Sequence, residues 1–229
     1  MPSKAGWRND SSEPDAPRAR GGYNEPMPAP THPADVLIIG GGAGGLSCAI
    51  TLASAQKKKW FEDRRIVIVD DGTSDLKKAR LFNVPGVTPG TLGSDLLSEL
   101  EVQLGQYECA TMLRGTVQRA ERLPGGRFIA TLEQGEEVVA TKLVIATGYK
   151  RWDVEGLDHV PEPHPKGGKT NRIHLPHDGC YRIEPDLHVA GLLAGGSSQF
   201  AIAAGIGAQV AVELLSEWAG KRTHVHDNA

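Results

Sequence analysis

The sequence predicts an α/β fold: a single domain with a parallel sheet, an antiparallel β meander and a closing C-terminal helix. A continuous apolar run at 34–39 is typical of a strand covered on both faces of a parallel sheet. A glycine-rich turn at 40–45 and a helical stripe follow, and the second apolar run, RIVIVDD at 65–71, completes a strand, helix, strand unit. Such a unit should be parallel and right-handed.

The later elements complete this architecture. Leu96, Leu97, Leu100 and Leu104 recur at helical spacing, which predicts a helix within 91–107. Three or four short alternating strands are expected between 115 and 145, with LPGG at 123–126 as a hairpin turn. Residues 180–193 predict further strand. Residues 200–218 are dense in alanine and glycine and predict the long closing helix.

The composition also divides the chain. Residues 1–33 combine Pro, Gly, Ser, Asp and Arg with almost no apolar periodicity, which predicts a flexible tail. The domain is expected at 34–222, built from 34–150 and 176–222, before a short tail at 223–229. The joining stretch, 151–175, is rich in Pro, Gly, His and Lys and predicts a linker or an excursion over the surface.

Composition and charge narrow the possible functions. A net charge of −3 and short, acid-flanked basic clusters argue against a nucleic-acid partner. No apolar run approaches the roughly 20 residues of a membrane span, and the N-terminus lacks the apolar core of a secretory signal. Three scattered cysteines do not predict a disulfide framework. We therefore expect a cytoplasmic protein without a membrane partner.

The glycine-rich turn predicts a dinucleotide site. Gly40, Gly42 and Gly45 fit G-x-G-x-x-G between a predicted strand and helix. The first glycine permits the tight turn, the second admits a pyrophosphate and the third allows close packing of helix on strand. The helix N-terminus offers free N–H groups to the phosphates. Asp70, or else Asp71, ends the second strand and is placed to accept hydrogen bonds from the ribose. Alternatively, the glycines serve close packing alone.

Four stretches resemble a known family: DVLIIGGGAGGLSCA, NVPGVTPGTLGSDLLSELEVQLGQY, LVIATGY and SQFAIAAGIGAQVA. Together they are similar to low-molecular-weight thioredoxin reductases and related flavoproteins with two dinucleotide-binding domains. The similarity covers residues 35 to about 156 and about 179 to 218. It implies that the cofactor is FAD, held by a Rossmann-like domain. The FAD-binding residues that we predict are Gly40, Gly42, Ala43, Gly44, Gly45, Asp70, Asp71, Asn83, Val117, Ala146, Thr147, Gly148, Gly191, Leu192, Gln199, Phe200 and Ala201.

The resemblance gives some of these residues a role. Asn83 would lie beside the flavin, and the segment around Thr147 would cross near the cofactor. The closing helix, headed by Gln199, would point its N-terminus at the flavin pyrimidine and favour negative charge on the reduced flavin. Each residue also has a simpler interpretation. Asn83 would be a turn residue before a proline, Thr147 a strand-end hydroxyl bonded to backbone, and Gln199 an ordinary helix cap.

The chain also departs from the resemblance. Only about fifty residues separate its ATG segment from the closing helix, where the family carries an NADPH domain with a Cys-x-x-Cys motif. A dithiol relay needs two nearby sulfurs, whereas Cys48, Cys109 and Cys180 are separated by 61 and 71 positions. Thioredoxin reductase activity is therefore not expected. Cys48 and Cys109 are interpreted as core residues, and Cys180 as a candidate reactive thiol.

A further departure concerns the cofactor site itself. Leu192 occupies the position of a family aspartate that contacts the FAD ribityl or pyrophosphate. Losing that carboxylate would cost about 1 to 3 kcal/mol of hydrogen bonding.

Two smaller patterns remain open. Lys150, Arg151 and Trp152 would either line the flavin face or form a surface turn. His174, His177 and Cys180 have a spacing that suits three metal ligands, but a structural zinc site needs four. We therefore expect no metal and interpret this stretch as a solvated, histidine-rich loop.

We predict an FAD-dependent oxidoreductase without a dithiol relay, and the sequence assigns no catalytic residue. Electrons would come from a separate donor protein, or directly from a small-molecule substrate at an open flavin face that a homodimer partner could cover. The alternative is a non-catalytic protein that binds flavin or an adenine nucleotide and acts through a protein partner. An NAD-binding domain is a weaker third interpretation.

Overall fold

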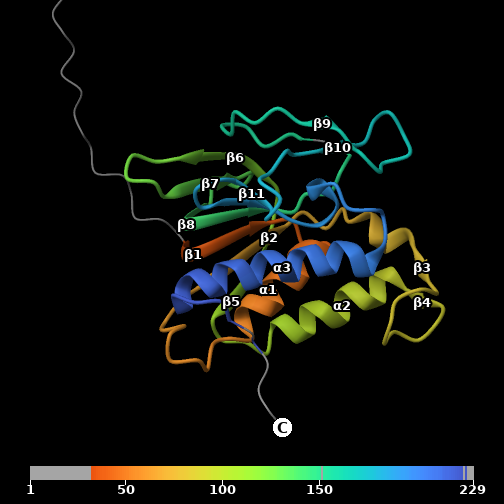
Figure 1. Cartoon of the computed structure of the whole chain (residues 1–229), viewed down its shortest axis with the longest axis horizontal. Coiled ribbons are helices and arrows are strands. Elements are labelled where there is room, and N and C mark those ends of the chain that lie inside the picture. Colours follow the sequence, from red (N-terminus) through yellow and green to blue (C-terminus); the bar gives the residue numbers. More distant parts are fainter. Residues whose placement is uncertain (1–31, 151, 224, 226–229) are drawn as a thin grey trace, which may run out of the picture.

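The computed structural model describes residues 32–150, 152–223 and 225, and an eight-stranded sheet forms its centre (Figure 1). Five strands are parallel, in the order β12, β8, β1, β2, β5. They are β1 (His32–Ile39), β2 (Ile66–Asp70), β5 (Ala110–Arg114), β8 (Glu137–Ile145) and β12 (Leu187–Val189). β11 (Arg182–Glu184) pairs antiparallel with β12 at one edge. The predicted parallel sheet is confirmed.

Side chains of β1 alternate between two apolar clusters. Val36 and Ile38 belong to the cluster on the helical face, whereas Leu37 and Ile39 belong to the cluster beneath the meander. All four are at most 4% exposed. Because both faces of the strand are covered, the sequence shows a continuous apolar run instead of alternation.

Helices α1 (Ala43–Ala53), α2 (Gly93–Leu104) and α3 (Phe200–Ala219) cover one face of the sheet (Figure 1). α1 and α3 pack unusually closely, because a Cβ built on Gly207 would lie 1.9 Å from the backbone oxygen of Gly44. The small residues of the closing helix therefore serve its approach to α1.

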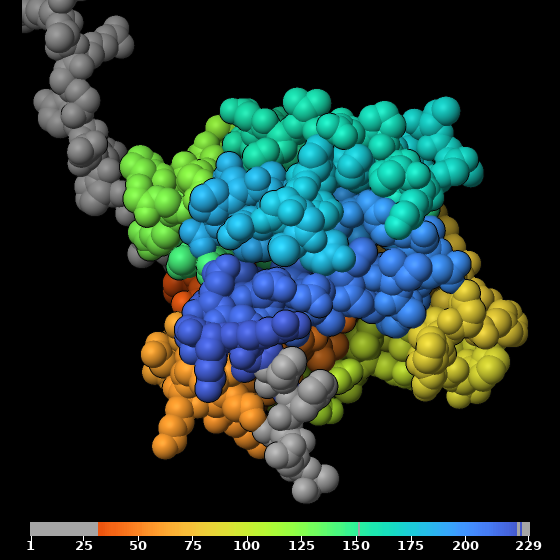
Figure 2. Space-filling view, viewed as in Figure 1, coloured from red at the N-terminus to blue at the C-terminus, as the bar shows by residue number. Residues whose placement is uncertain are grey.

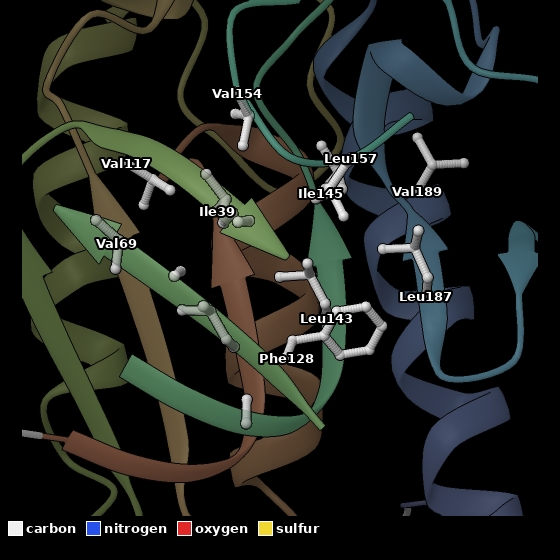
Figure 3. Close-up of a cluster of buried hydrophobic side chains, with 14 of the residues drawn as sticks. Ile39, Val69, Val117, Phe128, Leu143, Ile145, Val154, Leu157, Leu187 and Val189 are labelled. Atoms are coloured by element: carbon white, nitrogen blue, oxygen red, sulfur yellow. The ribbon is translucent and has the colours of Figure 1, made fainter. Parts of the chain in front are cut away.

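The antiparallel strands cover the opposite face. β6 (Val117–Arg122) and β7 (Phe128–Leu132) form a hairpin that continues into β8. Gly126 donates its N–H to the carbonyl of Leu123 at 3.0 Å, as the predicted turn requires. Figure 3 shows Phe128 beside Leu143 and the apolar side chains of the neighbouring strands in this cluster. The predicted meander is confirmed.

The structure corrects three boundaries. The first strand and the domain were expected from residue 34, after a tail at 1–33, but β1 already begins at His32. The meander was expected from residue 115, but Ala110–Arg114 already forms β5, the edge strand of the parallel sheet. None of its residues is fully buried, so it lacks the apolar run that marks β1 and β2. Strand was also expected through residue 193, but β12 ends at Val189. Gly191 has φ +67°, and the 3₁₀ turn η2 (Gly191–Ala194) begins there.

The stretch 151–175 was expected to be a linker or a surface excursion, and it contains structure of its own. β9 (Glu162–Pro163) pairs antiparallel with β10 (Ile173–His174). Val154, Leu157 and Leu175 are each at most 8% exposed and belong to the cluster beneath the meander, and Figure 3 shows the first two pointing onto the sheet. Single apolar residues in a Pro/Gly-rich stretch gave no periodic signal of this burial.

A short ordered segment joins β2 to α2. It consists of the 3₁₀ turn η1 (Asp75–Lys78) and a hairpin of β3 (Arg80–Leu81) and β4 (Thr91–Leu92).

Among the described residues, α3 alone is long and apolar enough to span a membrane, although no such run was expected. Its Val210, Ala211, Leu214 and Leu215 are fully buried in the cluster on the helical face. This is the packing of a core helix.

Candidate functional site

A cleft of about 640 Å³ opens where the parallel strands end. Its walls include Ile39 at the end of β1, Asp70 at the end of β2, Ala146 after β8 and Gly191 after β12. Open α/β sheets bind ligands at this edge, and the volume lies within the range of roughly 300 to 1,000 Å³ for small-molecule sites.

Most of the predicted cofactor residues line this cleft. They are Gly40, Gly42, Ala43, Gly44, Asp70, Asp71, Asn83, Val117, Ala146, Thr147, Gly148, Gly191, Leu192, Gln199 and Phe200. Gly45 and Ala201 do not. A Cβ on Gly45 would lie 1.8 Å from the carbonyl oxygen of Gly40, so Gly45 serves helix-on-strand packing. Ala201 is exposed on the first turn of α3, outside the cleft.

The glycine turn has the geometry of a phosphate site. Gly40 has φ +110°, and a Cβ there would lie 2.4 Å from the carbonyl oxygen of Ala146. Gly42 is the N-cap of α1 and offers no side-chain cap, and the first turn carries no acid. The N–H groups at the start of α1 therefore have no protein cap, as anion binding at a helix N-terminus requires.

Asp70 joins the glycine turn to the sheet edge. It is only 5% exposed, and its Oδ1 accepts the N–H of Gly41 at 2.9 Å. Its Oδ2 accepts from Arg114 at 2.8 Å, and Arg114 also pairs with Glu101 on α2. A carboxylate has about four acceptor positions, so capacity for ribose hydroxyls remains. Asp71 is exposed, and its Oδ1 accepts the N–H of Thr73.

No pattern in the sequence indicated Arg114 as a site residue. It lies opposite Asp70 in the β2–β5 register, and β5 was not expected as part of the parallel sheet.

The start of α3 is a second uncapped helix N-terminus in the same cleft. Gln199 is its N-cap residue, but its side chain makes no capping hydrogen bond and no acid occupies the first turn. Instead, Gln199 Oε1 accepts from Asn83 Nδ2 at 2.5 Å. On the other side, Tyr149 Oη lies 3.3 Å from Ser198 Oγ. Gln199 is thus a helix cap by position, but its side chain bonds to Asn83 and not to the helix backbone. Sequence reasoning singled out neither Tyr149 nor this contact.

Thr147 has an unsatisfied hydroxyl in the cleft. Its Oγ1 is shielded from water and has no hydrogen-bond partner among the described residues. The interpretation as a strand-end hydroxyl bonded to backbone is therefore wrong. Buried polar atoms nearly always have a partner, so this atom suits a ligand that supplies one.

Two histidines of the stretch after the ATG segment form hydrogen bonds with backbone carbonyls of η2. His164 Nε2 lies 2.9 Å from the carbonyl oxygen of Leu192, and His177 Nε2 lies 3.2 Å from that of Ala194. In each histidine, the backbone N–H two residues on donates to Nδ1, which leaves Nε2 as the donor to the carbonyl. Leu192 lines the cleft where the resemblance expects a carboxylate.

An ion pair joins two walls of the cleft. Lys150 Nζ, after the ATG segment, contacts Asp75 Oδ1 of η1, and both residues line the cleft. Lys150 is therefore part of the site, while Trp152 packs against the cluster beneath the meander. Arg151 lies outside the described residues.

The three cysteines are free and differ in exposure. Complete burial raises the pKa of the Cys48 thiol to about 12. Burial also raises the pKa of Cys109, and Cys180 is exposed. The described residues contain no group of three or more His, Cys, Asp or Glu arranged to hold a metal. Of the three residues once considered as ligands, His177 instead bonds to η2.

Comparison with known proteins places this geometry in a family. A family model described as pyridine nucleotide-disulphide oxidoreductase matches residues 34–187. A ferredoxin–NADP reductase of Flavobacterium psychrophilum is 31% identical over 114 residues, which are 50% of this chain and 32% of that protein. The chain thus matches about a third of the length of this relative.

Solved structures share the fold. A thioredoxin reductase from Gloeobacter violaceus superposes with a TM-score of 0.68 at 15% identity, covering 86% of this chain and 99% of that one. An oxidoreductase from Agrobacterium tumefaciens gives 0.67 at 15% identity, covering 82% and 99%.

Proposed function

The chain belongs to the pyridine nucleotide-disulphide oxidoreductase family, and we propose that it is a thioredoxin reductase-like member that binds FAD and acts as a flavin-dependent oxidoreductase. Its electrons would come from a separate donor, since this chain carries neither a second glycine motif nor a Cys-x-x-Cys. The single observation that carries the proposal is the cleft, where two uncapped helix N-termini open between four strand ends.

The residues present fit an FAD molecule laid along this cleft. The glycine turn and the start of α1 would hold the pyrophosphate, and Asp70 the ribose. The unsatisfied Thr147 hydroxyl would gain a partner on the cofactor.

At the other end, Asn83 and Gln199 would border the flavin ring, with the N-terminus of α3 directed at it. When bound, FAD supplies reversible two-electron chemistry. The chain's own part is to position the ring and to favour negative charge near α3, because the positive end of a helix dipole stabilises an anion.

An alternative is a non-catalytic protein that binds flavin or an adenine nucleotide and acts through a partner. Leu192 favours this alternative, because it places an apolar side chain in the cleft where the family's carboxylate would contact the cofactor. Weak flavin binding without turnover would follow from it.

The first test is the visible absorbance of the purified protein and chromatography of any cofactor released on denaturation. We expect a yellow protein that releases FAD in near-equal amount. Apoprotein would then be titrated with FAD, FMN, NAD and ADP. Tight binding of FAD alone supports the flavoenzyme, whereas equal affinity for ADP and FAD favours the nucleotide-binding alternative. Failure to bind FAD would contradict both the flavin-dependent oxidoreductase and the non-catalytic flavin-binding protein.

Three further expectations remain proposals. A small-molecule substrate could reduce the flavin directly, which anaerobic screening of reductants would reveal.

A homodimer could cover the flavin face, and a monomer in sedimentation would contradict this proposal. Exposed, unpaired Cys180 suits the cytoplasm, because thiols stay reduced there. Fractionation of cells that produce the protein would test this location.

A further inference from the structure

Two stretches of the chain contain basic residues and no acid. Residues 76–94 and 163–177 carry six of the 25 Lys and Arg residues and none of the 28 Asp and Glu residues. The six are Lys77, Lys78, Arg80, Lys166, Lys169 and Arg172, and we call them the basic rim. The whole chain has a net charge of −3, so the positive charge of these two stretches is a local feature.

The two stretches meet the same end of the cleft. The Arg172 guanidinium lies 4.8 Å from the centre of the Tyr149 ring, and Tyr149 contacts Ser198. The next residue, Gln199, accepts from Asn83, which lies in the other stretch. Figure 2 shows the yellow and teal segments along one side of the molecule, with the blue start of α3 between them. The basic rim therefore flanks the position proposed for the flavin ring.

The charges of the rim are not neutralised within the protein. In the part of the chain that the structure describes, none of the six cations forms an ion pair, whereas Arg114, Arg119, Arg122 and Arg182 all do. Five of the six are exposed, and Arg172 is partly so. Four acids border the two stretches in the sequence, and each has another partner. Asp75 pairs with Lys150, and Glu162 lies 3.9 Å from His174 Nε2. Asp178 pairs with Arg182, and Asp95 accepts from Ser94 Oγ.

The first of the two stretches also carries an exposed aromatic side chain. Phe82, next to Asn83, is 68% exposed, which is high for a large aromatic residue. Protein interfaces combine an aromatic anchor with a charged border, whereas a small anion would need only the charges. The surface thus fits a protein with an acidic face and an apolar centre.

We infer that the basic rim and Phe82 form a docking surface for a small acidic one-electron carrier protein. This inference deepens the proposed function and rests on it. Two reduced carriers would each lose one electron, and the electron pair with a proton from water would pass to the bound flavin. Complementary charge would speed their encounter, and this effect falls as salt screens it.

The test measures binding of a reduced or oxidised plant-type ferredoxin, used as the acidic probe, to both apoprotein and FAD-loaded protein. Calorimetry or fluorescence anisotropy gives the Kd at low and high salt. We expect binding that weakens with salt, and a K166Q/K169Q variant that binds about three- to tenfold more weakly at low salt. Both lysines lie outside the cofactor cleft. Phe82→Ser should weaken binding with little change in salt dependence.

The control variant is K57Q/K59Q, which makes the same charge change at the far end of α1, away from the cleft. It should bind the ferredoxin as the unchanged protein does. A basic cytochrome c should not bind the rim. Equal loss in both double variants, binding of cytochrome c, equally tight binding of a DNA duplex, or no binding of ferredoxin would overturn the inference.

The two proposals fail separately. If the protein holds FAD but does not bind ferredoxin, the docking surface is wrong and the flavoprotein stands. If ferredoxin binds the rim but FAD does not bind, the proposed function is wrong. In that case, the rim is a docking surface without a role in flavin reduction, and the inference as stated is overturned.

Discussion

The side-chain amide of Asn83 donates to Gln199 across 116 positions of sequence, at a distance of 2.5 Å from Nδ2 to Oε1. This contact joins the loop after β3 to the start of α3 at one end of the cleft. Both residues were nominated separately by resemblance to a flavin site. Neither of the two sequence motifs indicated that their side chains would form a hydrogen bond with each other.

The contact between Asn83 and Gln199 predicts coupled effects on FAD binding. Asn83→Ala and Gln199→Ala should each weaken FAD about three- to tenfold, because each removes a hydrogen bond that positions the other residue. The double variant should lose less than the sum, by more than about 0.5 kcal/mol. FAD titration by fluorescence quenching measures this. Gln209→Ala, an exposed amide further along α3, is the control; additive losses would show that the contact does not matter for the cofactor.

Thr147→Val should separate stability from cofactor binding. Valine has nearly the same shape, so the change removes a buried hydroxyl that lacks a partner. We expect the apoprotein to gain about 1 kcal/mol in unfolding free energy, while FAD binds about tenfold more weakly. Denaturant unfolding and FAD titration give the two values. Thr147→Ser should keep FAD affinity, and a valine variant with unchanged affinity would place the cofactor elsewhere.

Leu192→Asp should tighten FAD binding. Leu192 lines the cleft, and a carboxylate at this position would be able to accept hydrogen bonds from the cofactor. We expect the Asp variant to bind FAD about tenfold more tightly than the Leu192→Ala control, which adds no hydrogen-bond acceptor. Weaker binding of the Asp variant than of the Ala variant would mean that the carboxylate meets phosphate, and that the family's contact has no counterpart here.

Sequence patterns predicted the fold wherever a strand is covered on both faces or a helix has an apolar stripe. β1, β2 and α3 are examples. Edge strand β5 was missed because its residues are half exposed. The burial of Leu157 and Leu175 was missed because isolated residues in an irregular stretch have no period.

Site residues could be predicted from the sequence where the local backbone tolerates one residue type only. Contacts between residues far apart in the sequence could not be predicted in this way. Gly40 and Gly45 occupy positions that only glycine tolerates, so the motif could be recognised from the sequence. Arg114 beside Asp70 and His164 beneath Leu192 depend on strand register and loop packing. Nothing in the local sequence specifies these pairs.

Close packing of α1 on α3 predicts opposite effects for two glycines of one helix. Gly207→Ala places a Cβ 1.9 Å from the backbone oxygen of Gly44, so the helices must move apart, at a cost of about 3 kcal/mol or more. Gly205→Ala meets nothing within 4 Å and should stabilise by up to about 1 kcal/mol through helix propensity. Thermal and denaturant unfolding compare the two. Similar values for both variants would contradict the packing.

Stability should fall in mild acid because of His188. The side chain is 2% exposed, and burial lowers the pKa of its imidazole, opposed by the charge of Glu217 and reinforced by that of Lys142. The unfolded chain therefore takes up a proton near pH 6.5 that the folded protein does not. Stability from this residue is fully present above pH 6.5 and is lost as pH falls, by up to about 1.4 kcal/mol per pH unit.

The measurement is urea unfolding at a series of pH values between 7.5 and about 5, with His188→Leu as the variant. Leucine cannot take up a proton in either state, so its unfolding free energy should vary less steeply over this range. If the leucine variant retained the full slope, the acid sensitivity would belong to other groups, and His188 would be protonated equally in the folded and unfolded chains.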